Sequence, residues 1–332
     1  MLMYFPPFIY TFFVFLGTLV AISSNSMFGM WLGLEINLMA FIPMIINLEF
    51  NKKSTEAAIK YFLIQALASA MVIFAVMLFF VFNSFFSSVA PKIFMSIALC
   101  TKLGMAPFHF WFPEVLEGLT WVNSLILLTW QKISPLVILS FFLLNKFVLI
   151  LAVASALLGA ISGINQTSMR KILAFSSISH MGWITTIMIA NSTLWVDYFM
   201  IYSITSFILC VSFWTLNLNY FSQLVLIKDM KKKFMVFINL LSLGGLPPLL
   251  GFFPKWLAIY LLKWKFSVLM LLIFSSLVTL FFYTRLCFST FTLHTQNNTW
   301  FSKENNKKSS WVLSILMLFS ILGIIPLSLM IL

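Results

Sequence analysis

Four ionisable residues lie well inside long apolar segments of this sequence: Glu35, Lys102, Lys132 and Lys255. A charged side chain at the centre of a membrane helix costs about 2.5–3.5 kcal/mol even on a lenient insertion scale, so four unpaired ones would cost on the order of 12 kcal/mol. Such residues must therefore pair with one another or line a hydrated cavity. They are the first candidates for moving protons or other cations.

Lysine suits proton transfer better than arginine does. Burial disfavours the charged form of a lysine, whereas a nearby carboxylate favours it again. A lysine that is alternately close to Glu35 and far from it could bind and release a proton, which arginine could not because it stays charged. We expect Glu35 and Lys102 to lie within about a Debye length, roughly 8–10 Å, and to face the interior.

Two histidines are further candidates. His180 follows Ser176, Ser177 and Ser179 in one apolar segment. A histidine beside hydroxyl groups in a membrane can relay protons or hydrogen-bond a neighbouring helix, and we favour the relay. His109 follows Pro107, and for it a relay role and a structural role are equally open.

The composition shows which elements must position these residues. Of the 332 residues, 62% are hydrophobic and 8% are charged, against about 25% charged in soluble domains. The apolar runs are continuous, without the alternation of membrane β-strands. The sequence therefore predicts an all-α polytopic membrane protein of about eleven helices. We place them at 7–22, 27–46, 56–82, 91–110, 120–140, 145–165, 171–190, 195–220, 234–262, 266–293 and 311–331, with Glu114 and Glu117 in a solvated loop.

The basic residues predict an orientation. Eleven of them, including Lys231, Lys232 and Lys233, fall in predicted loops on the side of the N-terminus, and four fall in loops on the other side. The positive-inside rule places the N-terminus on the cytoplasm-like side, and an odd helix count places the C-terminus opposite. The same rule explains the net charge of +12, so we expect a lipid bilayer and no nucleic acid as the partner. The first basic residue is Lys52, so we read the first apolar run as a retained helix.

Two glycine- and proline-containing segments suggest an internal repeat. Leu103–Pro107 and Leu243–Pro247 share a pattern, and each falls in the fourth helix of a block of five. Two blocks with an odd number of helices must have opposite topologies, as in inverted-repeat transporters with paired broken helices. We predict a first repeat over 1–140, a second over 141–293, and a loop with a final helix over 294–332. A break in a helix leaves backbone carbonyls without their helical partners, and these carbonyls then need water or polar partners.

No cofactor site is predicted in this chain. It has no Gly-x-Gly-x-x-Gly or Walker motif. Cys100, Cys210 and Cys287 lie far apart in apolar runs without a Cys-x-x-Cys pattern, so a metal site is not expected. We interpret the cysteines as packing residues. Gly29-x-x-x-Gly33 and Gly159-x-x-x-Gly163 predict close helix packing.

Several of these blocks resemble a known family. They are Gly33-Leu34-Glu35-Ile36-Asn37, Ser54-Thr55-Glu56-Ala57-Ala58, Lys102-Leu103-Gly104-Met105-Ala106-Pro107-Phe108-His109-Phe110-Trp111, Leu128-Thr129-Trp130-Gln131-Lys132, Gly244-Gly245-Leu246-Pro247-Pro248 and Gly251-Phe252-Phe253-Pro254-Lys255-Trp256. They are similar to mitochondrial NADH–ubiquinone oxidoreductase chain 2 proteins, the antiporter-like subunits in the membrane arm of respiratory complex I.

The resemblance implies a function and roles. Glu35 would modulate Lys102, protons would pass laterally through Lys132, and Lys255 would exchange with one aqueous side. It implies the mitochondrial inner membrane, with the N-terminus on the matrix side, and other membrane-arm subunits as partners. NADH, FMN, iron–sulfur clusters and ubiquinone would be bound by other subunits. A sodium or potassium/proton antiporter subunit without redox coupling remains the alternative, and a structural spacer with inactive lysines is a third possibility.

Overall fold

The computed structural model describes residues 7–46, 52–81, 89–190, 193–227, 229–263 and 265–292, with Ser314 and Ser320 as single residues. This part of the chain consists of helices joined by turns and loops, which confirms the predicted all-α class. The predicted helix over 311–331 lies outside the described residues, apart from those two serines. The count of eleven spans therefore stays a prediction.

The helices follow the predicted segments closely, but several segments are divided. They are α1 (Pro7–Ser23), α2 (Met27–Ile45), α3 (Lys52–Val81), α4 (Val89–Leu103), α5 (Trp111–Gly118), α6 (Trp121–Leu128), α7 (Trp130–Phe141), α8 (Asn145–Gly163), α9 (Met169–Ala190), α10 (Trp195–Thr215), α11 (Phe221–Leu226), α12 (Met230–Gly244), α13 (Phe252–Leu261) and α14 (Phe266–Thr292). Among the described residues, seven segments are long and apolar enough to cross a membrane: α2, α3, the α6–α7 pair, α8, α9, α10 and α14.

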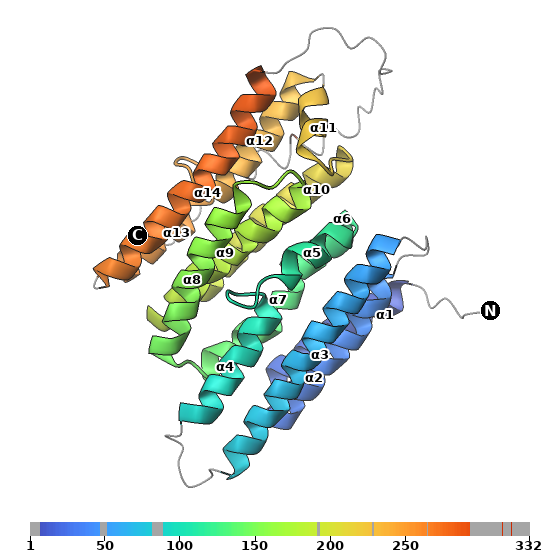
Figure 1. Ribbon diagram of the computed structural model, residues 1–332, viewed down its shortest axis with the longest axis vertical. Helices are drawn as coiled ribbons and strands as arrows, with labels where there is room; N and C mark the ends of the chain where they lie inside the picture. The colour runs from blue at the N-terminus through green and yellow to red at the C-terminus, as the bar shows by residue number, and fades with distance from the viewer. Residues whose placement is uncertain are drawn as a thin grey trace, which may run out of the picture. The chain divides into compact units, whose positions relative to one another are not determined.

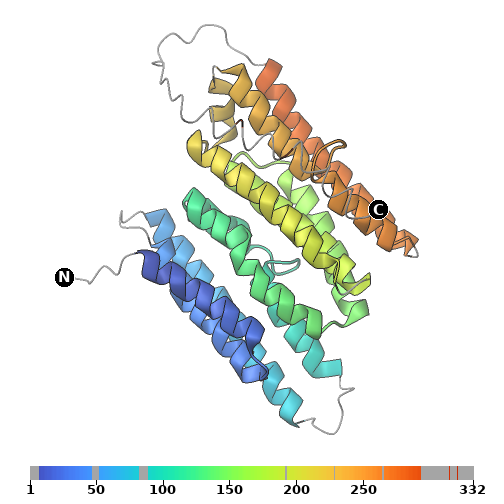
Figure 2. The same cartoon turned by 180° about the vertical axis from the view of Figure 1, so that it is seen from behind.

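The chain divides into two compact units, Met1–Ser155 and Ala156–Leu332. In the first unit, α1 packs against α2, and α3 packs against α2, α4 and α5, while α7 contacts α4 and α1. In the second unit, α9 is almost completely buried and contacts α10, α13 and α14, and α12 packs on both α10 and α14. Figure 2 shows the same helices from behind. The inverted relation of the two predicted repeats stays a prediction.

Both predicted helix breaks occur, and a glycine with a left-handed backbone makes each one. α4 ends at Leu103, and Gly104 follows with a φ of 69°. α12 ends at Gly244, and Gly245 follows with a φ of 80°. Glycine reaches this conformation without steric cost, which is why it commonly terminates helices. The predicted helices over 91–110 and 234–262 are therefore too long, because each stops at its glycine.

A third break was not predicted. The segment 120–140 divides at Thr129 into α6 and α7. Pro135 lies inside α7, where it cannot donate a backbone hydrogen bond and where its ring crowds the carbonyl of Gln131, four residues earlier. This weakens α7 near its first turn without ending it, and at the break itself the Thr129 hydroxyl donates back to the Leu125 carbonyl at 2.8 Å. The corresponding helix of the second predicted repeat, α14, is continuous.

Two loop predictions were wrong. Glu114 and Glu117 lie in α5 instead of a loop, and the Glu114 carboxylate forms a 2.6 Å ion pair with Lys60. Lys231, Lys232 and Lys233 begin α12, and the Lys233 side chain is buried with its Nζ donating to the Val225 carbonyl at 2.8 Å. Charged residues look like loop residues in an apolar sequence, but short helices at the ends of spans also carry them.

Glycines bring α1 and α2 into close contact. A Cβ atom at Gly17 would lie 2.7 Å from the backbone nitrogen of Asn37, and one at Gly33 would overlap the backbone of Ala21. Neither position can hold a larger residue unless the helices separate. The Gly29-x-x-x-Gly33 pattern therefore lies at a close-packed face, as small residues do between membrane helices. Gly159 has a similar role, with its Cβ position 2.7 Å from the Ser179 nitrogen.

We expect Gly33→Ala to destabilise the first unit by about 1–3 kcal/mol, because the new methyl group forces α1 away from α2. Thermal unfolding of the purified protein in detergent would measure the loss. Ala70→Val is the matched control, since it adds bulk at an exposed position of α3. An unchanged unfolding temperature for Gly33→Ala would contradict the packing argument.

Candidate functional site

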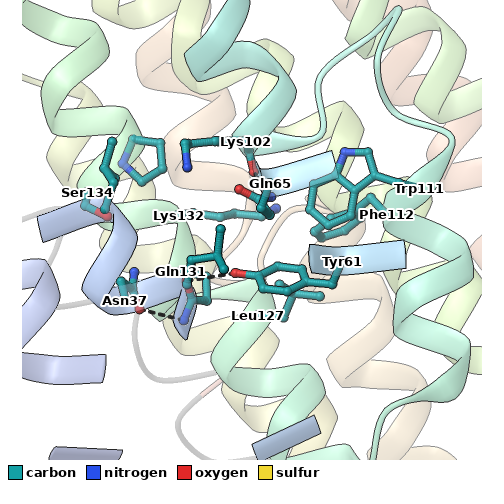
Figure 3. Close-up of a pocket in the computed structure, with 13 residues that line it drawn as sticks. Asn37, Tyr61, Gln65, Lys102, Trp111, Phe112, Leu127, Gln131, Lys132 and Ser134 are labelled. Carbon is teal, nitrogen blue, oxygen red and sulfur yellow. Dashed lines mark hydrogen bonds between the residues drawn. The ribbon is translucent and has the colours of Figure 1, made fainter. Parts of the chain in front are cut away.

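Lys102 and Lys132 line the same small cavity in the first unit (Figure 3). Lys102 lies in the last turn of α4 and Lys132 in the first turn of α7, so two broken helices each place one lysine at a break. Their side chains are 8% and 2% exposed. The cavity has a volume of about 20 Å³, and roughly 10–15 Å³ is enough for one water molecule.

Polar side chains from α2, α3 and α7 share the cavity wall with the lysines. They are Asn37, Tyr61, Gln65, Gln131 and Ser134. A buried water needs two to four polar partners, and this wall supplies them. The cavity can therefore hold a water molecule within reach of both amines.

The end of α4 is held by donors from neighbouring elements. The Trp111 indole donates to the Thr101 carbonyl at 3.2 Å, and Gln65 donates to the Lys102 carbonyl at 3.4 Å. The last carbonyls of a helix otherwise lack partners and carry the negative end of its dipole. That end lies beside Lys102, which stabilises positive charge there.

Lys132 has an aromatic neighbour from α5. Its Nζ lies 4.8 Å from the centroid of the Phe112 ring, a cation–π geometry. Phe112 also packs on Gly104, where a Cβ atom would lie 3.1 Å from the Phe112 Cβ. Gly104 therefore has two functions: it ends α4 and it makes room for the ring that covers Lys132.

The first turn of α7 connects Lys132 to three other helices. Trp130 donates to the Thr18 hydroxyl of α1 at 3.2 Å. The Gln131 side chain donates through Nε2 to the side-chain Oδ1 of Asn37 on α2 at 2.9 Å and accepts from the Tyr61 hydroxyl of α3 at 3.4 Å (Figure 3). These contacts were not predicted from the sequence, although amides in apolar helices are themselves a signal of internal hydrogen bonding.

Glu35 lies on α2, beside the cavity wall. It is partly buried, and its neighbours Leu34, Asn37 and Leu38 line the cavity. Its carboxylate interacts electrostatically with Lys102. The structure thus brings Glu35, Lys102 and Lys132 together in one unit.

His109 lies in the turn between α4 and α5. Its side chain is 6% exposed, its Nδ1 lies 3.3 Å from the Pro107 carbonyl oxygen, and its ring stacks on Phe110 with centroids 4.4 Å apart. These contacts are within its own turn. They support the structural role more directly than the relay role.

Lys255 lies at the break of the second unit. It belongs to α13, is 7% exposed, and donates through Nζ to the Gly244 carbonyl at 2.6 Å. The aliphatic part of its side chain passes beside Gly245, where a Cβ atom would lie only 2.9 Å from the Lys255 Cδ. The carbonyl freed by the break is therefore satisfied by the candidate lysine itself.

His180 lies in the middle of α9 and is 7% exposed. One ring nitrogen, Nδ1, lies 3.0 Å from the Tyr198 hydroxyl, and the ring packs against Tyr202 with centroids 5.2 Å apart. The second unit thus holds its own set of buried ionisable groups, with Lys255 and His180 on helices that contact each other.

Comparison with known proteins identifies the class. Residues 24–283 match a family model described as NADH:quinone oxidoreductase/Mrp antiporter, transmembrane. Two solved structures share the fold. One is a chain of respiratory complex I from Thermus thermophilus with bound aureothin (TM-score 0.83, 23% identity, 96% of this chain and 78% of that one). The other is a chain of the Mrp complex from a Dietzia species (TM-score 0.76, 17% identity, 83% and 59%).

Relatives of higher sequence identity show which branch of this class the chain belongs to. The chain is 47% identical to NADH-ubiquinone oxidoreductase chain 2 of Anopheles gambiae over 94% of each sequence. It is 43% identical to the chain of the same name from Mus musculus, over 90% of this chain and 88% of the mouse one. This chain belongs to the NADH-ubiquinone oxidoreductase chain 2 family, which confirms the resemblance found in its motifs.

The contact between Asn37 and Gln131 gives a prediction for stability. We expect Asn37→Leu and Gln131→Leu each to destabilise the protein by about 1–3 kcal/mol, because each leaves a buried amide unpaired. The double variant should cost less than the sum of the two, since the bond that Asn37 and Gln131 share is then lost only once. Thermal unfolding in detergent of all four proteins would measure the coupling, and additive losses would argue against the hydrogen bond.

Proposed function

We propose that this chain is a proton-translocating membrane subunit of NADH:ubiquinone oxidoreductase. The observation that carries the proposal is the cavity in the first unit, where two buried lysines from two broken helices share space for a water molecule. The relatives named chain 2 of that oxidoreductase support the assignment to the complex.

The cavity allows a proton to move between two amines. A protonated Lys102 gives a proton to a water in the cavity, and the same water gives a proton to the neutral amine of Lys132. The water is unchanged at the end, and one positive charge has moved from α4 to α7. The Phe112 ring stabilises that charge on arrival. Membrane-buried lysine suits this because it exists in both forms, depending on its surroundings.

Glu35 determines where the charge rests. Its carboxylate favours a proton on Lys102 while the two interact. Any change that separates them, or that neutralises Glu35, releases the proton towards Lys132. Quinone reduction in other subunits would drive such a change. Redox groups, including NADH, FMN, iron–sulfur clusters and ubiquinone, would be held by those subunits, so this chain would contribute to the enzyme without a redox site of its own.

Lys255 is proposed as the residue that exchanges protons with one aqueous side. It is buried at the break between α12 and α13, where the unwound backbone offers polar groups to water. His180 would serve the same unit as a relay. The chain would lie in the mitochondrial inner membrane with its N-terminus on the matrix side, where the basic loops gather, and would adjoin other membrane-arm subunits.

We expect Lys102→Met to lower both proton translocation and coupled NADH oxidation while the complex still assembles, because methionine fills the space but cannot carry a proton. Lys263→Met is the matched control, since Lys263 is exposed at the end of α13. Proton uptake by vesicles containing the assembled complex would measure the effect. Normal uptake by an assembled Lys102→Met complex would refute the relay.

The same vesicles distinguish the antiporter alternative. A redox-coupled subunit moves protons when NADH and quinone are supplied and does not depend on sodium or potassium. Cation-dependent proton movement without NADH would favour an antiporter subunit instead, in agreement with the second half of the family description.

A further inference from the structure

The second unit contains three buried tyrosines that the proposed function does not use. Tyr198 and Tyr202 lie one turn apart on α10, and Tyr283 lies on α14. Their side chains are 1%, 3% and 1% exposed. Buried hydroxyls are costly unless they have polar partners, so three of them on the two helices that pack against α9 need an explanation.

The helices that carry these tyrosines, α10 and α14, pack against α9, the helix that carries His180. The Tyr198 hydroxyl lies 3.0 Å from His180 Nδ1, and the Tyr202 ring packs on the imidazole. One turn earlier on α9, Ser177 faces the Tyr202 hydroxyl and Ser176 faces the Tyr283 hydroxyl. Tyr202 and Tyr283 are themselves close enough to interact electrostatically.

Tyr283 and Lys255 meet at the same pair of glycines. A Cβ atom at Gly244 would lie 3.2 Å from the Tyr283 Cδ2, and one at Gly245 would lie 2.9 Å from the Lys255 Cδ. Lys255 Nζ donates a hydrogen bond to the Gly244 carbonyl. The Tyr283 ring and the Lys255 side chain therefore both lie at this break.

Asn239 supplies a separate observation on the same helices. It is fully buried in α12, which packs on both α10 and α14, and among the described residues neither its side-chain nitrogen nor its side-chain oxygen has a hydrogen-bond partner. Buried amides are almost always paired with protein groups or ordered water. Such an amide can hold a water molecule beside the helices that carry Tyr202 and Tyr283.

We propose that Tyr202 and Tyr283 relay protons between His180 and Lys255. Each hydroxyl oxygen accepts a proton from the preceding group and gives its own proton to the next, directly or through one water, so each tyrosine ends neutral. The net result is the loss of a proton by the imidazolium of His180 and its gain by the amine of Lys255, or the reverse. This inference rests on the proposed function, because it assigns a path to the same proton movement.

Tyr202→Phe and Tyr283→Phe in the assembled complex test the relay, since each keeps the ring and removes only the hydroxyl. We expect each to slow NADH-driven proton uptake by vesicles by about tenfold or more, because removing a positioned proton-transfer group lowers rates by roughly 10²–10⁴-fold. Tyr260→Phe is the matched control, since Tyr260 is 63% exposed on α13. Unchanged uptake by both assembled variants would overturn the relay.

A second pair of variants covers the case in which a phenylalanine variant does not assemble. Tyr283→His keeps a group that carries protons, whereas Tyr283→Gln keeps polarity without that ability. Faster uptake with histidine than with glutamine supports the relay, and equal uptake overturns it. Lys102→Met serves as the reference: if it abolishes uptake while the tyrosine variants behave normally, only the relay fails, whereas normal uptake by Lys102→Met removes the proposed function as well.

Discussion

The structure depends on one constraint: where a membrane helix is broken, its freed carbonyl groups must find donors inside the protein. The two glycine breaks meet this constraint differently. At the end of α12 the donor is the ammonium of Lys255, which donates a hydrogen bond to the Gly244 carbonyl. At the end of α4 the donors are Trp111 and Gln65, so Lys102 is not needed for the backbone. Its amine is left to face the cavity.

This difference separates the roles of the two units. In the first unit a second break, at Thr129, adds Lys132 to the cavity, and the two amines share one volume. In the second unit α14 is continuous, and buried hydroxyl groups around His180 take the place that a second lysine occupies in the first. The first unit therefore places two lysines at one cavity, whereas the second places Lys255 at a helix break and His180 beside a tyrosine hydroxyl.

Much of this was predictable from the sequence. Buried lysines stand out because charge is costly in lipid, and the breaks at Gly104 and Gly245 follow from backbone conformations that glycine readily adopts. The break at Thr129 was missed because neither glycine nor proline occurs at that position. Pairings such as Asn37 with Gln131 depend on how distant helices pack, and no local pattern encodes that. The helical position of Glu114 was missed because its partner, Lys60, is also distant in sequence.

That last contact shows how the buried site is tied to the surface. The ion pair of Glu114 and Lys60, at 2.6 Å, holds α5 against α3, and both side chains are about half exposed. Phe112, two residues before Glu114 on the same short helix, covers the Lys132 amine. An exposed ion pair adds little stability by itself. In this protein Glu114 lies in the first turn of the eight-residue helix α5, the same turn that places Phe112 over the buried amine. A displacement of α5 would therefore change the position of the Phe112 ring over Lys132.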